Sequence, residues 1–293
     1  NLGMIGAHGN RCANKALAES DLLIMVGSRV ADRAIISPEE IQRRMATIHI
    51  DVDPAEIGKN MQAAIPLVGD VKVILQQLLA LQVPPPDDAQ WREQLKEYRQ
   101  AELERVFPRR DGSVFPGTVL RKLGRLLDDD AVVCVDVGQN QIFACKYLPQ
   151  KHGRLLTSGG LGTMGYALPA AVGVKVALPD RQTIVICGDG SFQMAMNELA
   201  AVRCAGMDLK IVLFRNHVLG LVHQIQKTEP YHGPFGVDLD GSPDFAAIAA
   251  AYGIPSLTVD DEDKLDETLA RFLGTQGSCI LICEVHPEVS TTD

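Results

Sequence analysis

The chain has 293 residues, a formal net charge of −9 at pH 7 and 46% hydrophobic residues. This composition is typical of a folded globular protein and excludes collagen-like, low-complexity and disordered classes. The acidic charge argues against nucleic acid or an anionic membrane as a partner. No window approaches the roughly 18 uninterrupted apolar residues of a membrane span. A prior of about 150 residues per domain predicts two domains.

Strand-like runs alternate with helical patterns along the chain. The predicted strands are 22–26, 47–52, 132–137, 183–187, 209–214 and 280–285, and the predicted helices are 71–82, 90–106, 116–127, 192–205 and 264–273. Most of the strand-like runs are continuously apolar, which is typical of strands buried on both faces of a parallel sheet. The alternation predicts an α/β fold with two doubly wound parallel-sheet domains.

Three consecutive prolines at 84–86 mark a domain boundary, because they cannot continue a helix and favour an extended linker. We predict a first domain at 1–83, a linker and charged helix at 84–107, and a second domain at 108–293. The first block shows only two clear strands, fewer than an α/β layer normally uses. We therefore expect a further strand upstream of Asn1 and expect the chain to be a fragment.

The seven cysteines are an odd number, and four of them lie in strand-like runs: Cys134, Cys187, Cys279 and Cys283. Such positions favour buried, reduced thiols. Cys279 and Cys283 have no second close pair that would complete a zinc site. Since no signal-peptide pattern is present, we expect a cytoplasmic protein.

The strongest local signal is the run TIVICGDGSF at 183–192. A buried strand ends at Gly188, turns through Asp189 and Gly190, and enters a helix at Ser191. Glycine lets the backbone approach a ligand closely, and a helix N-terminus attracts phosphate. Asp189 could hold a divalent cation against that phosphate. The alternative is an ordinary turn with Ser191 as the helix cap.

About 25 residues further on, the predicted strand 209–214 ends in Arg215 and Asn216. Successive parallel strands present their carboxyl ends at one edge of the sheet, so Asn216 should lie beside Asp189. A carboxylate, an amide oxygen and a backbone carbonyl form a ligand set that suits Mg²⁺. For Asn216 alone, the alternative is a turn-forming asparagine.

This pairing resembles the thiamine diphosphate motif, and the resemblance extends along the chain. Residues 1–83 resemble most of the central domain, and residues 108–293 the diphosphate-binding domain, of the acetolactate synthase family. The matching stretches are LGMIGAHG (2–9), SDLLI (20–24), HIDVDPAEIGKN (49–60), VGQNQ (137–141), GLGTMGY (160–166) and the segment 188–222. Several motifs in the family's order are more specific than any one of them.

The resemblance implies a role for each matching residue. Asp189, Asn216 and the backbone carbonyl of Val218 would ligate Mg²⁺. Met164 would support the bent conformation of the cofactor, and its alternative is core packing. The other implied contacts of thiamine diphosphate are Gln139, Asn140, Gly162, Gly190, Ser191 and, near the substrate, Leu221 in place of the usual methionine.

FAD is a second cofactor that the resemblance raises, in the central domain. The positions that bind it in the family correspond to Arg29, Asp51 and Asp70, each after a strand-like run. Val30 replaces the usual aromatic residue, and Arg29 fits a surface ion pair equally well. The sequence therefore leaves FAD open.

The implied reaction is decarboxylation of pyruvate with carboligation to a second 2-keto acid. The resemblance also implies a homodimer or homotetramer, with a regulatory subunit left open. The family's activating glutamate belongs to a domain that would precede Asn1, so no catalytic residue is assigned in this chain. The alternatives are another thiamine diphosphate-dependent decarboxylase or oxidase of 2-keto acids, and a non-catalytic cofactor-binding fragment.

A dinucleotide-binding fold is a rival from another class. Residues 160–165 fit its Gly-x-Gly-x-x-Gly spacing. However, no clear strand is predicted directly before them, and Asp189 is the only acid near the expected distance. The sequence therefore favours the thiamine diphosphate interpretation.

Overall fold

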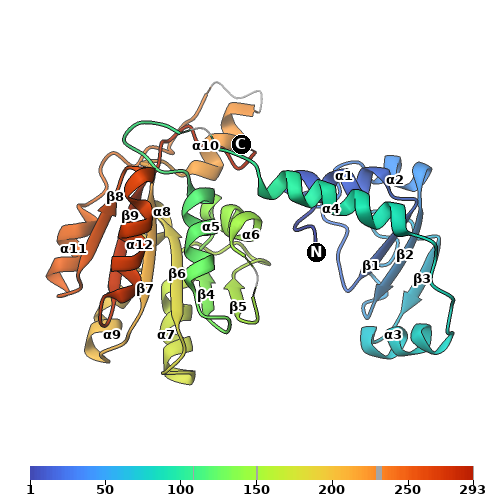
Figure 1. The fold of residues 1–293 in the computed structure, drawn as a ribbon, viewed down its shortest axis with the longest axis horizontal. Coiled ribbons are helices and arrows are strands. Elements are labelled where there is room, and N and C mark those ends of the chain that lie inside the picture. The colour runs from blue at the N-terminus through green and yellow to red at the C-terminus, as the bar shows by residue number, and fades with distance from the viewer. Residues whose placement is uncertain (108, 150, 229–232, 293) are drawn as a thin grey trace. The chain divides into compact units, whose positions relative to one another are not determined.

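The computed structural model describes residues 1–107, 109–149, 151–228 and 233–292. The chain forms two compact units, Asn1–Val106 and Phe107–Asp293 (Figure 1). Within the described ranges, no helix has the length and apolar character needed to cross a membrane.

The first unit is built on a three-stranded parallel sheet in the order β1-β2-β3. Its elements are α1 (Arg11–Glu19), β1 (Leu22–Val26), α2 (Pro38–Arg44), β2 (Ala46–Asp51), β3 (Ile65–Val68), α3 (Val71–Ala80) and α4 (Ala89–Leu103). The predicted strands 22–26 and 47–52 correspond to β1 and β2. The sequence shows two clear strands in this block, and the structure adds a third, β3. This strand is four residues long and contains Pro66, a residue type that strand interiors disfavour, so it does not stand out as a strand in the sequence.

One face of this sheet carries the core of the first unit. The core residues are Met25, Val30, Ile35, Ile41, Met45 and Met61. On β1, successive side chains alternate between faces, so Leu22, Ile24 and Val26 lie opposite Met25, and all three are exposed. The described residues therefore cover one face of β1 and leave apolar side chains on the other.

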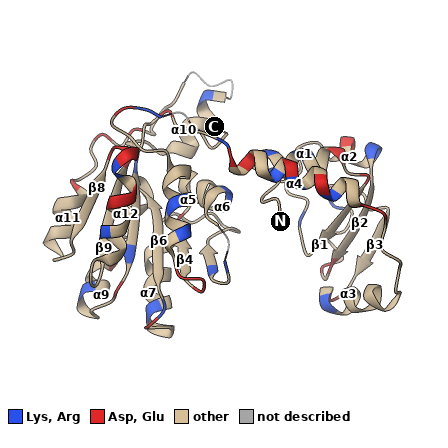
Figure 2. Ribbon diagram, viewed as in Figure 1, with Lys and Arg blue, Asp and Glu red and all other residues tan. Residues whose placement is uncertain are grey.

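Helix α4 lies within the segment 84–107 that the sequence predicts to be a linker and helix. It packs along α1, where the ammonium of Lys15 lies 4.1 Å from the ring centroid of Tyr98 and Gln94 donates to Glu19 at 3.1 Å. None of its residues is buried, and acidic and basic side chains lie along its length (Figure 2). These contacts place α4 in the first unit.

The second unit contains a six-stranded parallel sheet in the order β5-β4-β6-β7-β9-β8. The strands are β4 (Val132–Val135), β5 (Arg154–Thr157), β6 (Thr183–Gly188), β7 (Lys210–Arg215), β8 (Ser256–Val259) and β9 (Cys279–Glu284). The four inner strands confirm predicted runs. The edge strands β5 and β8 are missed because they are short, half-exposed and partly polar.

Helices cover both faces of this sheet (Figure 1). On one face lie α5 (Pro116–Leu126), α6 (Gln139–Tyr147) and α12 (Leu265–Gly274), and on the other lie α7 (Ala167–Ala177), α9 (Leu199–Cys204) and α11 (Phe245–Ala251). Strand residues alternate between the two cores, with Val133 and Val135 in one and Val132 and Cys134 in the other. The α/β class with parallel sheets is thus confirmed.

The predicted helix 192–205 is interrupted. The chain instead forms α8 (Asp189–Gln193), a 3₁₀ turn (Met196–Glu198) and α9. The residue that caps α8 is Gly188, and Ser191 is already inside the helix. The Ser191 hydroxyl accepts from the Gly188 N–H at 3.1 Å and donates to the Gly188 carbonyl at 3.2 Å. The predicted helix start at Ser191, and its alternative as a cap, are therefore corrected: Ser191 closes the turn from within.

The cysteines predicted to be buried thiols are buried and free. Cys134 lies in β4, Cys187 in β6, and Cys279 and Cys283 in β9. Burial raises the pKa of Cys134 to about 12, so this side chain stays protonated at neutral pH.

Lys210, at the start of β7, is a buried cation and is 6% exposed. Its ammonium pairs with Asp208 at 2.6 Å and donates to the carbonyls of Thr275, at 2.8 Å, and Gly277. We expect Lys210→Met to lower the free energy of unfolding by about 2–4 kcal/mol, because both carbonyls lose their donor. Urea unfolding followed by circular dichroism measures this loss.

Lys122→Met is the matched control for this measurement. The Lys122 ammonium pairs with Asp266 at the surface, where an ion pair contributes less than about 1 kcal/mol. Equal losses in the two variants would show that the contacts of Lys210 add nothing beyond a surface pair.

Candidate functional site

A cavity opens at the carboxyl edge of the second unit's sheet. Its wall includes residues that follow β4, β6, β7 and β9. After β4 the chain turns to one side to form β5, whereas β6 lies on the other side of β4. Such a switch point is where open α/β sheets bind ligands.

Three helices begin at the wall of this cavity. Their first residues are Gln139 of α6, Asp189 of α8, and Gly220 of α10 (Gly220–Thr228). The first N–H groups of a helix have no partner within the helix and carry a partial positive charge. None of the described residues that line the cavity is Lys or Arg. A bound anion would therefore be held by backbone N–H groups, as phosphates are at helix N-termini.

Two glycines keep the wall open. A Cβ atom at Gly190 would lie 2.7 Å from Cδ2 of Leu219, and one at Gly220 would lie 2.1 Å from Oε1 of Gln139. A side chain at either position would displace its neighbours or fill the cavity, so glycine leaves the backbone accessible to a ligand. The cradle fits a group that is bound through phosphate oxygens.

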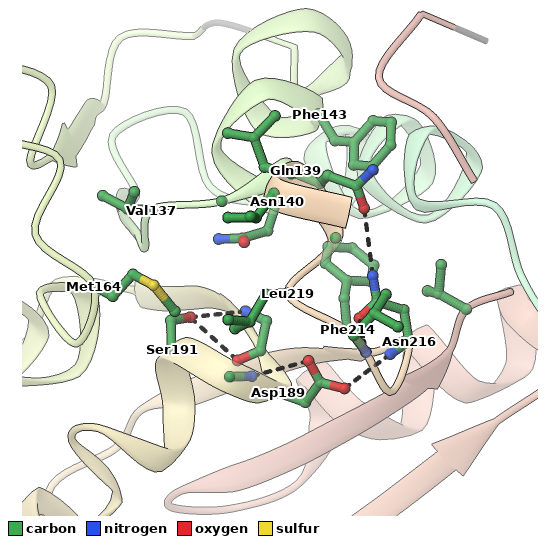
Figure 3. Close-up of a pocket in the computed structure, with 18 of the residues that line it drawn as sticks. Val137, Gln139, Asn140, Phe143, Met164, Asp189, Ser191, Phe214, Asn216 and Leu219 are labelled. Carbon is green, nitrogen blue, oxygen red and sulfur yellow. Dashed lines mark hydrogen bonds between the residues drawn. The ribbon is translucent and has the colours of Figure 1, made fainter. Parts of the chain in front are cut away.

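Asp189 and Asn216 lie side by side, as the sequence predicts (Figure 3). Oδ2 of Asp189 accepts the N–H groups of Asn216 at 3.1 Å and His217 at 2.8 Å, and Oδ1 accepts that of Gly190 at 2.9 Å. Asp189 is 2% exposed. Burial raises the pKa of its carboxyl group, and the three hydrogen bonds to the carboxylate oppose this rise without cancelling it. A buried carboxylate of this kind is stabilised by a cation.

The carbonyl of Val218 is the third oxygen ligand that the resemblance implies. The carbonyl of His217 accepts from Leu239, and the N–H of Leu219 donates to Val237, both at 2.8 Å. Val218 and Asp238 face each other between these two bonds as a pair that exchanges no backbone hydrogen bonds, so the carbonyl of Val218 takes no part in the pairing. Its N–H is bound by Oδ1 of Asn216 at 3.2 Å, and Val218 lines the cavity.

The cavity thus offers a carboxylate, an amide oxygen and a carbonyl oxygen. Such hard oxygen donors suit Mg²⁺, with phosphate oxygens and water completing the shell. Among the residues that the structure describes, no cluster of three or more His, Cys, Asp or Glu could hold a metal ion. A cation here would therefore depend on this mixed set, with Asp189 as its anionic member.

Residues 237–242 contact both of the turns that carry Asp189 and Asn216, and no sequence pattern marks these residues as part of the site. Asp238 pairs with Val218 in an isolated antiparallel bridge. Further along, Oγ of Ser242 accepts from Nε2 of Gln193 in α8 at 2.9 Å. The segment therefore joins the Asp189 turn to the Asn216 turn. It carries no motif that could have revealed this role.

Gln139 and Asn140 lie at the predicted place, but their side chains are bound to the protein. Nε2 of Gln139 donates to the carbonyl of Val289 at 2.8 Å, and its Oε1 accepts from Nδ2 of Asn216 at 3.3 Å. Nδ2 of Asn140 donates to the carbonyl of Asp136 at 2.6 Å. A diphosphate group would therefore meet the backbone N–H groups at the start of α6.

Met164 and Leu221 line the cavity, whereas Gly162 does not. Cε of Met164 lies 3.6 Å from a Cβ built at Gly190, so the thioether lies over the Gly-Asp-Gly turn (Figure 3). The wall also contains apolar residues that the sequence does not mark as site residues, such as Val137, Phe143, Phe214, Leu219 and Val222. Such residues cannot be told from ordinary core residues by pattern alone.

The three candidate FAD positions stand at the carboxyl edge of the first unit's sheet. Arg29 follows β1 and is exposed, Asp51 ends β2, and Asp70 follows β3. Asp51 accepts the N–H of Asp53 at 2.9 Å, and Asp70 caps α3 through the N–H of Val73 at 3.1 Å. Both carboxylates are therefore engaged with the backbone.

The structure decides against the dinucleotide alternative. Residues 160–165 do follow a strand, β5, which corrects the expectation from the sequence. In a dinucleotide-binding fold, however, the next strand in the chain lies beside the first. Here β4 lies between β5 and β6, and neither Gly160 nor Gly162 lines the cavity.

Comparison with known protein families assigns the class. Residues 136–283 match the family described as thiamine pyrophosphate enzyme, C-terminal TPP binding domain, and residues 1–78 match the thiamine pyrophosphate enzyme, central domain. The chain therefore belongs to the thiamine pyrophosphate enzyme family. Its second unit contains the domain that binds thiamine pyrophosphate, the diphosphate named above.

Within this family the chain is similar to acetolactate synthases. It is 40% identical over 277 residues to acetolactate synthase of Mycobacterium bovis, covering 91% of this chain and 45% of the relative. It is 37% identical over 269 residues to the acetolactate synthase large subunit of Lactococcus lactis, covering 92% and 47%. For the isozyme 1 large subunit of Escherichia coli the identity is 36% over 292 residues, covering 98% and 51%. The chain spans about half the length of the curated relatives it matches.

Proposed function

We propose that the protein containing this chain is an acetolactate synthase-like transferase. It decarboxylates pyruvate and joins the remaining two-carbon unit to a second 2-keto acid, with thiamine diphosphate and Mg²⁺ as cofactors. The observation that carries this proposal is the cavity at which three helices begin, where Asp189 lies beside Asn216 and no described lining residue is Lys or Arg. The similarity to relatives named acetolactate synthase supports the type of reaction.

The residues of this chain bind and orient the cofactor. When bound, thiamine diphosphate supplies a thiazolium ring that stores the electron pair released as a 2-keto acid loses carbon dioxide. Asp189, Asn216 and the Val218 carbonyl hold Mg²⁺, and the N–H groups at the starts of α6 and α8 bind phosphate oxygens. Met164 and Leu219 exclude water beside the Gly-Asp-Gly turn. Asp189 is the one carboxylate among the described residues of the wall, so no general base is assigned.

Product analysis with pyruvate tests the reaction. The full-length enzyme, supplied with thiamine diphosphate and Mg²⁺, should release acetolactate. Acetaldehyde alone would identify a simple decarboxylase, and an oxidised two-carbon product would identify an oxidase. Calorimetry of the chain itself separates two further outcomes. Cofactor binding without turnover would indicate a cofactor-binding fragment, and no binding by a folded sample would overturn the proposal.

We propose FAD as the cofactor of the first unit, at the sheet edge that carries Arg29, Asp51 and Asp70. The purified protein should then show flavin absorbance, and Arg29→Ala should reduce the amount retained. A colourless wild-type protein that takes up no added FAD would contradict this assignment.

We further propose a homodimer or homotetramer, with or without a regulatory subunit, that acts in branched-chain amino acid biosynthesis in the cytoplasm. Light scattering on the purified enzyme tests the assembly, and a monomer at working concentration would contradict it.

A further inference from the structure

Asp136 is a buried carboxylate to which the roles above assign no function. It follows the last residue of β4 and is 1% exposed. Oδ1 accepts the N–H groups of Val137 at 2.8 Å and Gly165 at 2.9 Å, and Oδ2 accepts the N–H of Ala167 at 3.0 Å. Three backbone donors thus converge on one carboxylate in a site closed to water. Such charge-assisted bonds are about twice as strong as bonds between neutral groups.

The partners of Asp136 belong to two walls of the cofactor cavity. Val137 lines the cavity on the β4 side, and Gly165 directly follows Met164, which lines it on the other. Ala167 is the first residue of α7. The carboxylate therefore connects the end of β4 to the loop that carries Met164 and to the helix that follows it.

Among the described residues, few other hydrogen bonds involve this loop, which comprises residues 158–165. One of them, from the N–H of Gly159 to the carbonyl of Thr157 at 2.9 Å, reaches only the end of β5. The N–H of Gly162 donates to the carbonyl of Ser158 at 3.0 Å, and that of Thr163 donates to Oγ of Ser158 at 3.1 Å. Both bonds stay inside the loop, and Leu161 at its tip is 92% exposed. Among the described residues, Asp136 is the side chain whose hydrogen bonds join this loop to the sheet.

We propose that Asp136 is a positioning residue that holds the Met164 loop against the cofactor site. The proposal rests on the proposed function, since the loop matters to catalysis only if the cavity binds thiamine diphosphate. Gly165 has a φ of 85°, so the chain reverses immediately after Met164. A bond at the N–H of Gly165 therefore sets the direction in which the Met164 side chain enters the cavity. Without it, Met164 no longer stays over Gly190.

Hydrogen exchange of the full chain without ligand is the direct test. Asp136→Asn keeps the size of the side chain but replaces one acceptor oxygen by an NH₂ group that faces a backbone N–H. We expect peptides covering residues 158–168 to exchange about 10- to 100-fold faster. Peptides covering α8 should be unchanged. Should Asp136→Asn fail to fold, Asp136→Glu keeps the charge but displaces it, and the same local increase is expected.

Asp244→Asn is the matched control. Asp244 is also an acidic residue of the second unit whose carboxylate accepts two backbone N–H groups, those of Ala246 and Ala247, and it lies outside the cavity wall. The Asp244→Asn variant should leave the rate of hydrogen exchange in peptides covering residues 158–168 unchanged. Unchanged exchange there in both Asp136 variants, or an equal increase throughout the second unit, would overturn the proposal.

Kinetics of the full-length enzyme separate positioning from stability. At saturating cofactor, Asp136→Asn should lower kcat about tenfold while KM for pyruvate stays within about twofold, because a misplaced Met164 impairs a bound cofactor. An unchanged kcat with faster loop exchange would show that the loop position does not matter for catalysis. If the wild-type protein binds no thiamine diphosphate, the proposed function fails, and the exchange result still decides whether Asp136 holds the loop.

Discussion

Asp189→Asn is expected to weaken Mg²⁺-dependent binding of thiamine diphosphate by at least about 100-fold. Asp189 is the anionic member of the oxygen set, and no other carboxylate among the described residues lines the cavity. The amide keeps the shape of the side chain but removes the charge that would face the cation. Loss of one partner from a buried charge pair amounts to about 3–5 kcal/mol, which corresponds to a factor of about 100 or more in affinity.

Calorimetric titration of thiamine diphosphate at fixed Mg²⁺ measures this effect. Asp266→Asn is the control, because Asp266 is an exposed acid of α12 that pairs with Lys122 at the surface and does not line the cavity. The far-UV circular dichroism of both variants should match the wild type. Wild-type affinity in a folded Asp189→Asn variant would mean that the cation is not held by this carboxylate.

Gly220→Ala is the second change expected to have a large effect, and here the cause is steric. The added Cβ would lie 2.1 Å from Oε1 of Gln139 and 2.6 Å from Nδ2 of Asn216. Gln139 is bound to both Asn216 and the Val289 carbonyl, so it cannot move without breaking these bonds. We expect cofactor affinity to fall at least tenfold, and stability to fall by about 1–3 kcal/mol, because Asn216 is displaced from its position beside Asp189.

Gly173→Ala is the matched control for this effect. Gly173 lies within α7, and a Cβ there meets no heavy atom within 4 Å. Alanine is the better helix former by up to about 1 kcal/mol, so this variant should bind the cofactor normally and be equally or more stable. If both glycine variants behave alike in titration and thermal unfolding, crowding at Gly220 is not what limits the cavity.

Much of the second unit could be predicted because its inner strands are buried on both faces. A continuous apolar run such as 183–187 has few alternatives, and the carboxyl ends of parallel strands must meet at one edge. This geometry alone predicts that Asn216 lies beside Asp189. Edge strands such as β5 and β8 have one exposed side and mixed composition, so their runs resemble loops.

The sequence by itself determined the parallel α/β class, the glycine-lined turn and the pair Asp189 and Asn216. Each of these follows from local residue type and spacing. The tertiary structure alone shows that the Asp136 carboxylate accepts the N–H of Gly165 beside Met164, and that Gln139 donates to the carbonyl of Val289. These contacts join segments far apart in the chain, and a side chain's hydrogen-bond partners there depend on how strands and helices pack. No local pattern records that packing.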